Sequence, residues 1–168
     1  KKEFYGLAFK VTQHVLIPRP ETEHLVDEAL SWLSERNAKR IQVLELGVGS
    51  GCLGLAVAAQ DPRVELFGCD VSPEALRVAN CNTDSLGLTS RVRYVLGDAV
   101  SLSPEDYGLQ TSGESILVLM NPPYIDWDDP CVEESVRSFE PHLALFANDQ
   151  GLACIKSWVE WVFRSFQG

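Results

Sequence analysis

Four short, mainly apolar runs, separated by segments of helical character, constrain the fold of this chain more than any other feature. The runs are Ile41–Leu46, Val64–Cys69, Val92–Leu96 and Ile116–Met120. Runs of this length are typical of buried strands, and helices between successive strands predict a parallel sheet with crossover connections. We therefore expect an α/β fold in which a mostly parallel sheet carries helices on both faces.

Local start signals and apolar spacing mark the helices. Ser72-Pro73-Glu74 combines an N-cap residue with proline at the first helical position, which predicts a helix ending near Gly87. The last helix is expected to pack its apolar face on the sheet, with pairing to another chain as the alternative. That face consists of Ile155, Trp158, Val159, Val162 and Phe166. That last helix is expected over Leu152–Phe166, and the others from about Thr22, over Cys52–Gln60 and from Ser103, with a helical turn near Val132–Arg137.

Residues 1–20 are expected to form a β-hairpin followed by a proline turn. The hairpin is placed around a polar turn at Thr12-Gln13-His14, and Pro18-Arg19-Pro20 ends it. Residues 21–168 then form the main domain. Because doubly wound sheets usually continue past four strands, we expect C-terminal strands to be missing from this chain.

Composition and charge disfavour several classes of function. The chain has 168 residues and is 45% hydrophobic, which suits one domain with a core. A net charge of −10, with only 14 Lys and Arg, argues against binding to nucleic acid. Without a long apolar run or a signal-peptide pattern, we expect no membrane span and a cytoplasmic location, or an organelle. Five cysteines without C-x-x-C spacing predict free thiols and no metal site.

A glycine-rich loop, Glu45–Gly51, follows the first apolar run and precedes a helix. Two templates fit it. Gly49-x-Gly51-x-x-Gly54 matches the dinucleotide fingerprint, whereas Gly47-x-Gly49-x-Gly51 after the acidic Glu45 matches loops that hold S-adenosylmethionine. Asp70, at the end of the second run, can accept hydrogen bonds from ribose hydroxyls in either case. The glycine spacing therefore leaves NAD and S-adenosylmethionine both open.

The ends of the third and fourth runs favour S-adenosylmethionine. Asp98, in Gly97-Asp98-Ala99, can accept from an adenine amino group, and Asn121-Pro122-Pro123-Tyr124 follows the fourth run. Ligands of open α/β sheets bind at these carboxyl ends. The prolines lack N–H groups, so the side-chain oxygen of Asn121 and the carbonyl of Pro122 make a socket for a planar amino group beside Tyr124. A dehydrogenase would more often need a proton-transferring residue here.

With these residues the chain resembles the class I S-adenosylmethionine-dependent methyltransferases. More narrowly, it resembles the HemK/PrmC-type protein-glutamine N5-methyltransferases that modify peptide-chain release factors. Leu16–Glu23 is similar to that family's I-P-R-P-x-T-E signature, Asn121–Ile125 to its catalytic element, and Arg137–Leu145 with Gly151-Leu152 to the segment that follows. Such enzymes usually add a helical domain before this region, and a fifth strand and a hairpin after it.

The resemblance implies a Rossmann-like core and a role for each matched residue. It implies that the cofactor S-adenosylmethionine contacts Asn121 as well as the strand ends, and that a Gly-Gly-Gln loop of a release factor is the partner. It implies no particular oligomeric state. The cofactor residues are Glu45, Gly47, Gly49, Gly51, Asp70, Asp98, Ala99 and Asn121; the catalytic residues are Asn121, Pro122 and Tyr124; the substrate residues are these three with Pro123, Phe9 and Arg19.

Three alternatives stay open. The Asn-Pro-Pro-Tyr element is shared with adenine-N6 nucleic-acid methyltransferases, although the acidic charge disfavours them. The glycine spacing by itself also allows a NAD(P)-dependent oxidoreductase. A third possibility is a truncated fragment that binds the cofactor but does not catalyse a reaction.

Overall fold

The computed structural model describes residues 1–111 and 115–166, and a parallel sheet lies at its centre. Its strand order is β5-β4-β3-β6. The strand of this sheet that comes first along the chain, β3, is therefore an interior strand, and the connection to β6 reverses the direction of winding. Such a reversal is where open α/β sheets bind ligands. All four expected strands are present: β3 (Ile41–Leu46), β4 (Val64–Asp70), β5 (Val92–Leu96) and β6 (Ile116–Met120).

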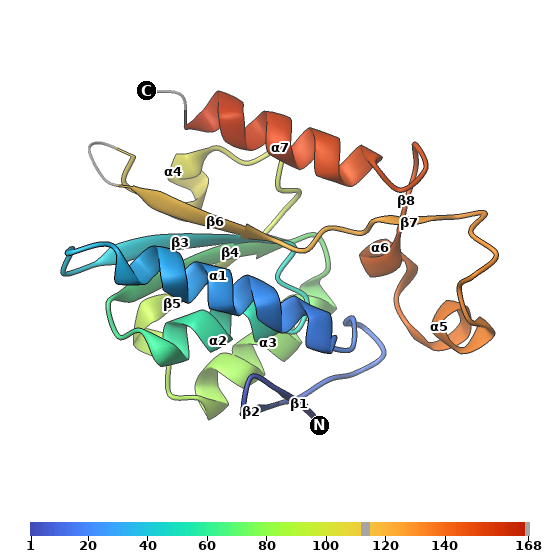
Figure 1. Cartoon of the computed structure of the whole chain (residues 1–168), viewed down its shortest axis with the longest axis horizontal. Coiled ribbons are helices and arrows are strands. Elements are labelled where there is room, and N and C mark those ends of the chain that lie inside the picture. The colour runs from blue at the N-terminus through green and yellow to red at the C-terminus, as the bar shows by residue number, and fades with distance from the viewer. Residues whose placement is uncertain (112–114, 167–168) are drawn as a thin grey trace.

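Helices cover both faces of this sheet, as expected (Figure 1). One face carries α1 (Glu23–Ser34), α2 (Cys52–Gln60) and α3 (Pro73–Ser85). The other face carries the short α4 (Pro104–Tyr107) and the long α7 (Ala153–Ser165). Ser72 caps α3 as predicted, because its hydroxyl oxygen accepts from the Ala75 N–H at 3.1 Å.

The central strand β3 contributes side chains to the core on both faces. Val43 packs in one apolar cluster with residues of α1 and α2, whereas Leu44 and Leu46 pack in a second cluster with Tyr107 and Trp161. Successive side chains of a strand point to opposite faces, so a strand covered on both sides is apolar throughout. This geometry explains why β3 is mainly apolar, with Gln42 and Glu45 as its two buried polar residues.

The apolar face of α7 packs on the sheet. Trp158, Val162 and Phe166 lie against the cluster that includes Val118 and Met120 of β6. Trp161 is buried there, and its indole N–H donates to the Leu102 carbonyl at 2.9 Å. Trp158, Val162 and Phe166 of the predicted face therefore pack on the sheet as expected, whereas Val159 is exposed and Trp161, which was not assigned to that face, is buried.

The N-terminal hairpin exists, but the turn predicted at Thr12-Gln13-His14 is wrong. Strands β1 (Lys2–Phe4) and β2 (Leu7–Phe9) are joined by Tyr5 and Gly6, whose φ angles are 51° and 73°. Positive φ at both central residues is the two-residue turn that matches strand twist, and glycine adopts it without strain. Val15 lies outside any strand and packs against α3 instead.

Smaller elements gather beyond the end toward which β6 points (Figure 1). They connect β6 to α7, and the sequence analysis identified only a helical turn near Val132–Arg137. The elements are β7 (Ile125–Asp126), α5 (Glu134–Phe139), α6 (His142–Leu145) and β8 (Phe146–Ala147). Two 3-10 turns, Pro20–Thr22 and Thr89–Arg91, precede α1 and β5.

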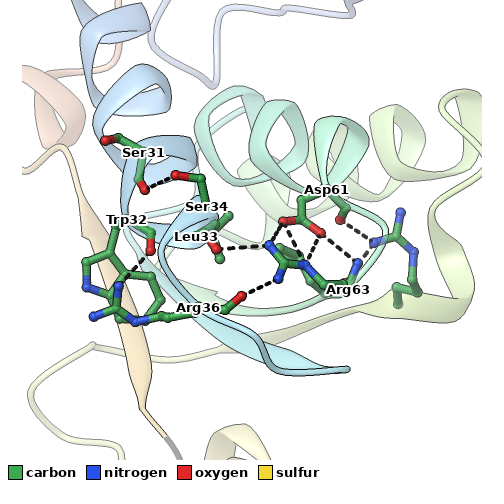
Figure 2. Close-up of polar contacts among 9 residues, drawn as sticks. Ser31, Trp32, Leu33, Ser34, Arg36, Asp61 and Arg63 are labelled. Atoms are coloured by element: carbon green, nitrogen blue, oxygen red, sulfur yellow. Dashed lines mark hydrogen bonds and ion pairs between the residues drawn. The ribbon is translucent and has the colours of Figure 1, made fainter.

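Arginines close the opposite end of the fold, at the amino ends of the strands (Figure 2). The Arg63 guanidinium donates to the carbonyls of Leu33 and Arg36 at 2.9 and 2.6 Å, and contacts the Asp61 carboxylate at 2.6 Å. Carbonyls at a helix end lack partners within the helix, so this network satisfies the end of α1. Hydrogen bonding from Arg63 lowers the pKa of Asp61. The carboxyl ends of the strands are left for a ligand.

Asn82 of α3 joins three segments that otherwise lie far apart in the sequence. Its amide oxygen accepts from the Lys10 N–H at 2.7 Å, and its amide nitrogen donates to the carbonyls of Lys10 and Ser50 at 3.0 and 2.8 Å. The side chain is only 1% exposed. It therefore ties the N-terminal segment and the glycine-rich loop to the same helix.

Replacing this buried amide should destabilise the fold. We expect Asn82→Leu to lower the free energy of unfolding by about 3 kcal/mol, because buried donors and acceptors lose their partners. Urea denaturation followed by circular dichroism measures the change. Asn80→Leu, at an exposed asparagine of the same helix, is the matched control and should change stability by less than about 0.5 kcal/mol. Equal effects for the two variants would contradict this role of Asn82.

Candidate functional site

The glycine-rich loop is held against the end of β4. The N–H groups of Gly47 and Val48 both donate to the Cys69 carbonyl at 3.0 Å, and the Gly49 N–H donates to the Asp70 carboxylate at 2.8 Å. Gly47 and Gly49 have φ angles of 70° and 55°, which favour glycine. The loop thus bends sharply after β3 and leaves backbone exposed to the space beyond the strands.

A cavity of about 470 Å³ lies beyond the strand ends, within the size range of small-molecule sites. Its wall includes residues at the ends of β3 and β4 and residues that directly follow β5 and β6. The site predicted from the sequence is thus brought together in space, although the role of each residue stays a prediction. The predicted residues that line this larger cavity are Arg19, Glu45, Gly47, Gly49, Asp70, Asp98, Ala99, Asn121 and Pro123.

Two predicted site residues lie elsewhere. Phe9, expected near the substrate, is fully buried in the apolar cluster of the hairpin and α1, with its ring edge-on to Phe4. Gly51, expected to contact the cofactor, does not line the cavity. A Cβ atom there would lie 2.9 Å from Leu55 and 3.4 Å from Ala79, so this glycine permits close packing where α2 begins. Both residues support the site from within the fold.

Glu45 is a buried carboxyl group at the edge of the larger cavity. It is 3% exposed, and its Oε2 atom has no hydrogen-bond partner in the described part of the chain. Burial raises the pKa of Glu45 to about 8, and the nearby charge of Asp70 acts in the same direction. An acceptor of this kind beside a cavity suits a ligand that brings a hydrogen-bond donor or a positive charge.

Asp70 and Asp98 supply further acceptors at the ends of β4 and β5. The Asp70 carboxylate is fixed by the N–H groups of Gly49 and Ser72 at 2.8 and 2.9 Å, and burial raises its pKa. Asp98 is exposed and accepts from the Val100 N–H at 3.2 Å. Each carboxylate retains lone pairs for hydroxyl or amino donors of a ligand.

Asn121 lies between the larger cavity and a second, smaller one of about 270 Å³. Pro122 is buried and Tyr124 is 59% exposed, and both line the smaller cavity together with residues of α5 and its preceding loop. Asn121 lines both cavities, so it can contact two ligands at once. The residues shared by both walls are Leu16, Arg19, Asn121 and Ala144.

Helix α7 contributes two residues that the sequence analysis did not place in the site. Cys154 and Trp158 line the larger cavity, and a Cβ atom on Gly47 would lie 2.7 Å from the Trp158 ring. The apolar spacing of α7 identified Trp158 as a packing residue only. Nothing local in the sequence indicates that its ring reaches the glycine-rich loop, more than 100 residues earlier.

A family model described as a methyltransferase domain matches residues 43–137. The chain belongs to this methyltransferase family. Residues 43–137 include most of β3, all of β4, β5 and β6, the glycine-rich loop and the Asn-Pro-Pro-Tyr element, but not Arg19 or α7. The family agrees with the Rossmann-like fold expected from the sequence.

Curated relatives are named release factor glutamine methyltransferase. The protein of Koribacter versatilis is 37% identical over 156 residues, which are 92% of this chain and 52% of that protein. The protein of Chlorobaculum tepidum is 40% identical over 150 residues, 86% of this chain and 49% of that protein. The chain thus spans about half the length of the curated relatives it matches.

Solved structures support the fold. The hMettl16 catalytic domain, solved in complex with a 3′UTR hairpin, is 14% identical with a TM-score of 0.66, covering 95% of this chain and 58% of that one. A putative RNA methyltransferase from Pyrococcus horikoshii is 18% identical with a TM-score of 0.54, covering 87% of this chain and 55% of that one. At these identities the likeness concerns the fold alone.

Two further findings concern the described residues. Residues 1–111 and 115–166 contain no group of three or more His, Cys, Asp or Glu placed to hold a metal ion. They also contain no helix long and apolar enough to cross a membrane.

Because Gly47 lies against Trp158, we expect an alanine substitution to destabilise the protein more at Gly47 than at Gly49. Gly49→Ala should cost about 1–2 kcal/mol of stability from positive φ alone, because a Cβ atom there meets nothing within 4 Å. Gly47→Ala adds a clash with Trp158 and should cost more. Urea denaturation of both variants, and of Gly47→Ala combined with Trp158→Phe, measures the difference. Strictly additive effects in the double variant would contradict the contact.

The buried carboxyl of Glu45 predicts a pH dependence of stability. Its folded-state pKa of about 8 lies above the ordinary 4.5, so the native state holds a proton that the unfolded chain releases. The contribution to stability is present below pH 4.5 and is lost as the pH rises toward 8. Glu45→Gln should flatten this fall, with Asp70 still contributing part of it. Denaturation midpoints across this range test it, with Glu105→Gln, at an exposed site, as control; an unchanged slope in Glu45→Gln would contradict the assignment.

Proposed function

We propose that this chain is the catalytic part of an S-adenosylmethionine-dependent methyltransferase that methylates a glutamine side-chain nitrogen in a peptide-chain release factor. The observation that carries the proposal is the position of Asn121, which lines both a cofactor-sized cavity and an adjoining smaller one. The relatives named release factor glutamine methyltransferase support this choice of substrate. Release factors act at ribosomes, which favours a cytoplasmic or organellar location.

The larger cavity fits S-adenosylmethionine. Glu45, Asp70 and Asp98 present acceptors in it, and the cofactor brings an ammonium group, ribose hydroxyls, an adenine amino group and a cationic sulfur. In this proposal Asp70 holds the ribose, Asp98 and Ala99 flank the adenine, and Gly47 and Gly49 lie along the methionine part. Glu45, a buried carboxyl group whose Oε2 has no hydrogen-bond partner among the described residues, also lines this cavity.

The smaller cavity receives the glutamine side chain. Its amide has two N–H donors, which the Asn121 side-chain oxygen and the Pro122 carbonyl accept, while Tyr124 packs on the amide plane and Pro123 keeps the backbone rigid. S-adenosylmethionine, when bound, would supply the methyl group, and its sulfur would keep the electrons of the broken bond. The amide nitrogen, held by Asn121 and Pro122, would give its lone pair to the new bond and lose a proton to water. The chain contributes mainly positioning and electrostatic stabilisation.

Other readings have less support. An adenine-N6 methyltransferase would use the same socket for an exocyclic amine, but the net charge of −10 disfavours a nucleic-acid substrate. A NAD(P)-dependent oxidoreductase rests on the glycine spacing alone, and the family match argues against it. A fragment that only binds the cofactor is separated from the proposed enzyme by an activity measurement.

Two substitutions separate chemistry from cofactor binding. Asn121→Ala should reduce methyl transfer to a release factor by about 10²–10³-fold, because it removes an oriented acceptor at the reacting nitrogen. Its affinity for S-adenosylhomocysteine, measured by calorimetry, should change little. Asp70→Ala should instead weaken S-adenosylhomocysteine binding by about 10–100-fold.

NADH titration is the control for cofactor identity. Binding of NADH in place of S-adenosylhomocysteine would sink the proposed function. A folded Asn121→Ala variant that no longer binds S-adenosylhomocysteine would contradict the role given to Asn121. Wild-type protein that binds this ligand but methylates adenine rather than glutamine would identify the nucleic-acid alternative.

A further inference from the structure

The ion pair between Arg19 and Glu140 lies beside the junction of the two cavities. The guanidinium Nη2 donates to Glu140 Oε1 at 2.5 Å, and the other carboxylate oxygen accepts from the Ile17 N–H at 3.2 Å. The Glu140 side chain is 7% exposed, whereas that of Arg19 is 36% exposed and lines both cavities. The buried Glu140 carboxylate thus holds the guanidinium of Arg19, a residue that lines the site.

The Arg19 guanidinium has donors to spare. It carries five N–H groups, and Glu140 is the hydrogen-bond partner that the described residues provide. No other Arg or Lys among those residues lines either cavity. The cation is therefore placed where a ligand passing between the cavities would meet it.

A glutamine amide needs a donor as well as acceptors. Its two N–H groups match the oxygens of Asn121 and Pro122, but its carbonyl oxygen must also be paired once it leaves water. Pro122 and Pro123 cannot supply that donor, because proline has no N–H. An amide nitrogen and oxygen have nearly the same shape, so acceptors on one side and a donor on the other are what distinguish the productive orientation from the flipped one.

We propose that Arg19 donates a hydrogen bond to the carbonyl oxygen of the substrate glutamine, and that Glu140 is the positioning residue that holds the guanidinium for this contact. The inference rests on the proposed function. A flipped amide would place its oxygen against the oxygens of Asn121 and Pro122 and its amino group against a cation. Arg19 therefore raises the fraction of bound glutamine whose nitrogen faces the methyl donor.

The competing explanation is that the ion pair has a structural role only and holds the proline turn to the segment after α5. We call this role a latch. Arg19→Lys separates the two, because lysine keeps the ion pair with Glu140 but loses the planar fork that can reach two acceptors at once. A latch would keep its activity in this variant. The proposal expects an unchanged unfolding temperature, unchanged S-adenosylhomocysteine affinity and a kcat about 10²-fold lower.

Glu140 is tested through its conservative variants. Glu140→Gln should lower kcat by about tenfold, because a neutral amide holds the guanidinium less firmly, and Glu140→Asp should recover part of the loss. Arg40→Lys is the matched control, since Arg40 forms an exposed ion pair with Glu65 at 3.0 Å at the amino ends of the strands. This control should leave kcat unchanged.

Each variant and the wild-type protein are assayed in parallel in the same form. The quantities measured are kcat and KM at saturating cofactor, the affinity for S-adenosylhomocysteine and the unfolding temperature. A wild-type kcat in Arg19→Lys overturns the inference and leaves the proposed function intact. Activity losses that run parallel to losses of folding or of S-adenosylhomocysteine binding identify a latch and also overturn it. Wild-type protein that transfers no methyl group to glutamine removes the proposed function and this inference together.

Discussion

Parallel pairing of β3 with both β4 and β6 is the constraint on which the site depends. Leu46 pairs with Cys69 on one side and with Met120 on the other. The residues that follow these three positions therefore begin at the same edge of the sheet, and they include the glycine-rich loop, Asp70 and Asn121. Parallel strands place all their carboxyl ends together, which an antiparallel arrangement of the same segments would not do.

Charge is divided between the two ends of the sheet. At the amino ends, arginines such as Arg63 satisfy the carbonyls that terminate α1 (Figure 2). At the carboxyl ends, Glu45 is buried and Asp70 is half-buried beside a cavity, and desolvation raises the pKa of both. The first arrangement stabilises the fold, whereas the second places poorly solvated acceptors where a cationic ligand would stabilise them.

Segments outside the methyltransferase family match complete the walls of the site. Residues 43–137 supply the sheet and the loops after its strands. Arg19 comes from the proline turn before this region and Trp158 from after it, as does Glu140, which forms the ion pair with Arg19. These later segments differ most from a bare nucleotide-binding fold, and they are where substrate selection is expected to reside.

The sequence by itself determined the four strands, the helices between them and the strand ends that carry polar residues. These features depend on local apolar spacing, helix caps and turn residues, which short segments carry without help from the rest of the chain. Even so, the hairpin turn was misplaced at Thr12-Gln13-His14, which are polar but not typical turn residues, whereas Gly6 is the local signal for the true turn.

Only the tertiary structure decided which of these residues meet. In the structure Phe9 is buried in the core, Gly51 lies at the start of α2 rather than in the cavity wall, and Trp158 packs against Gly47. The structure also pairs Arg19 with Glu140 across 121 residues of sequence. Contacts over such distances follow from how whole helices and strands pack, and no local pattern along the chain encodes them.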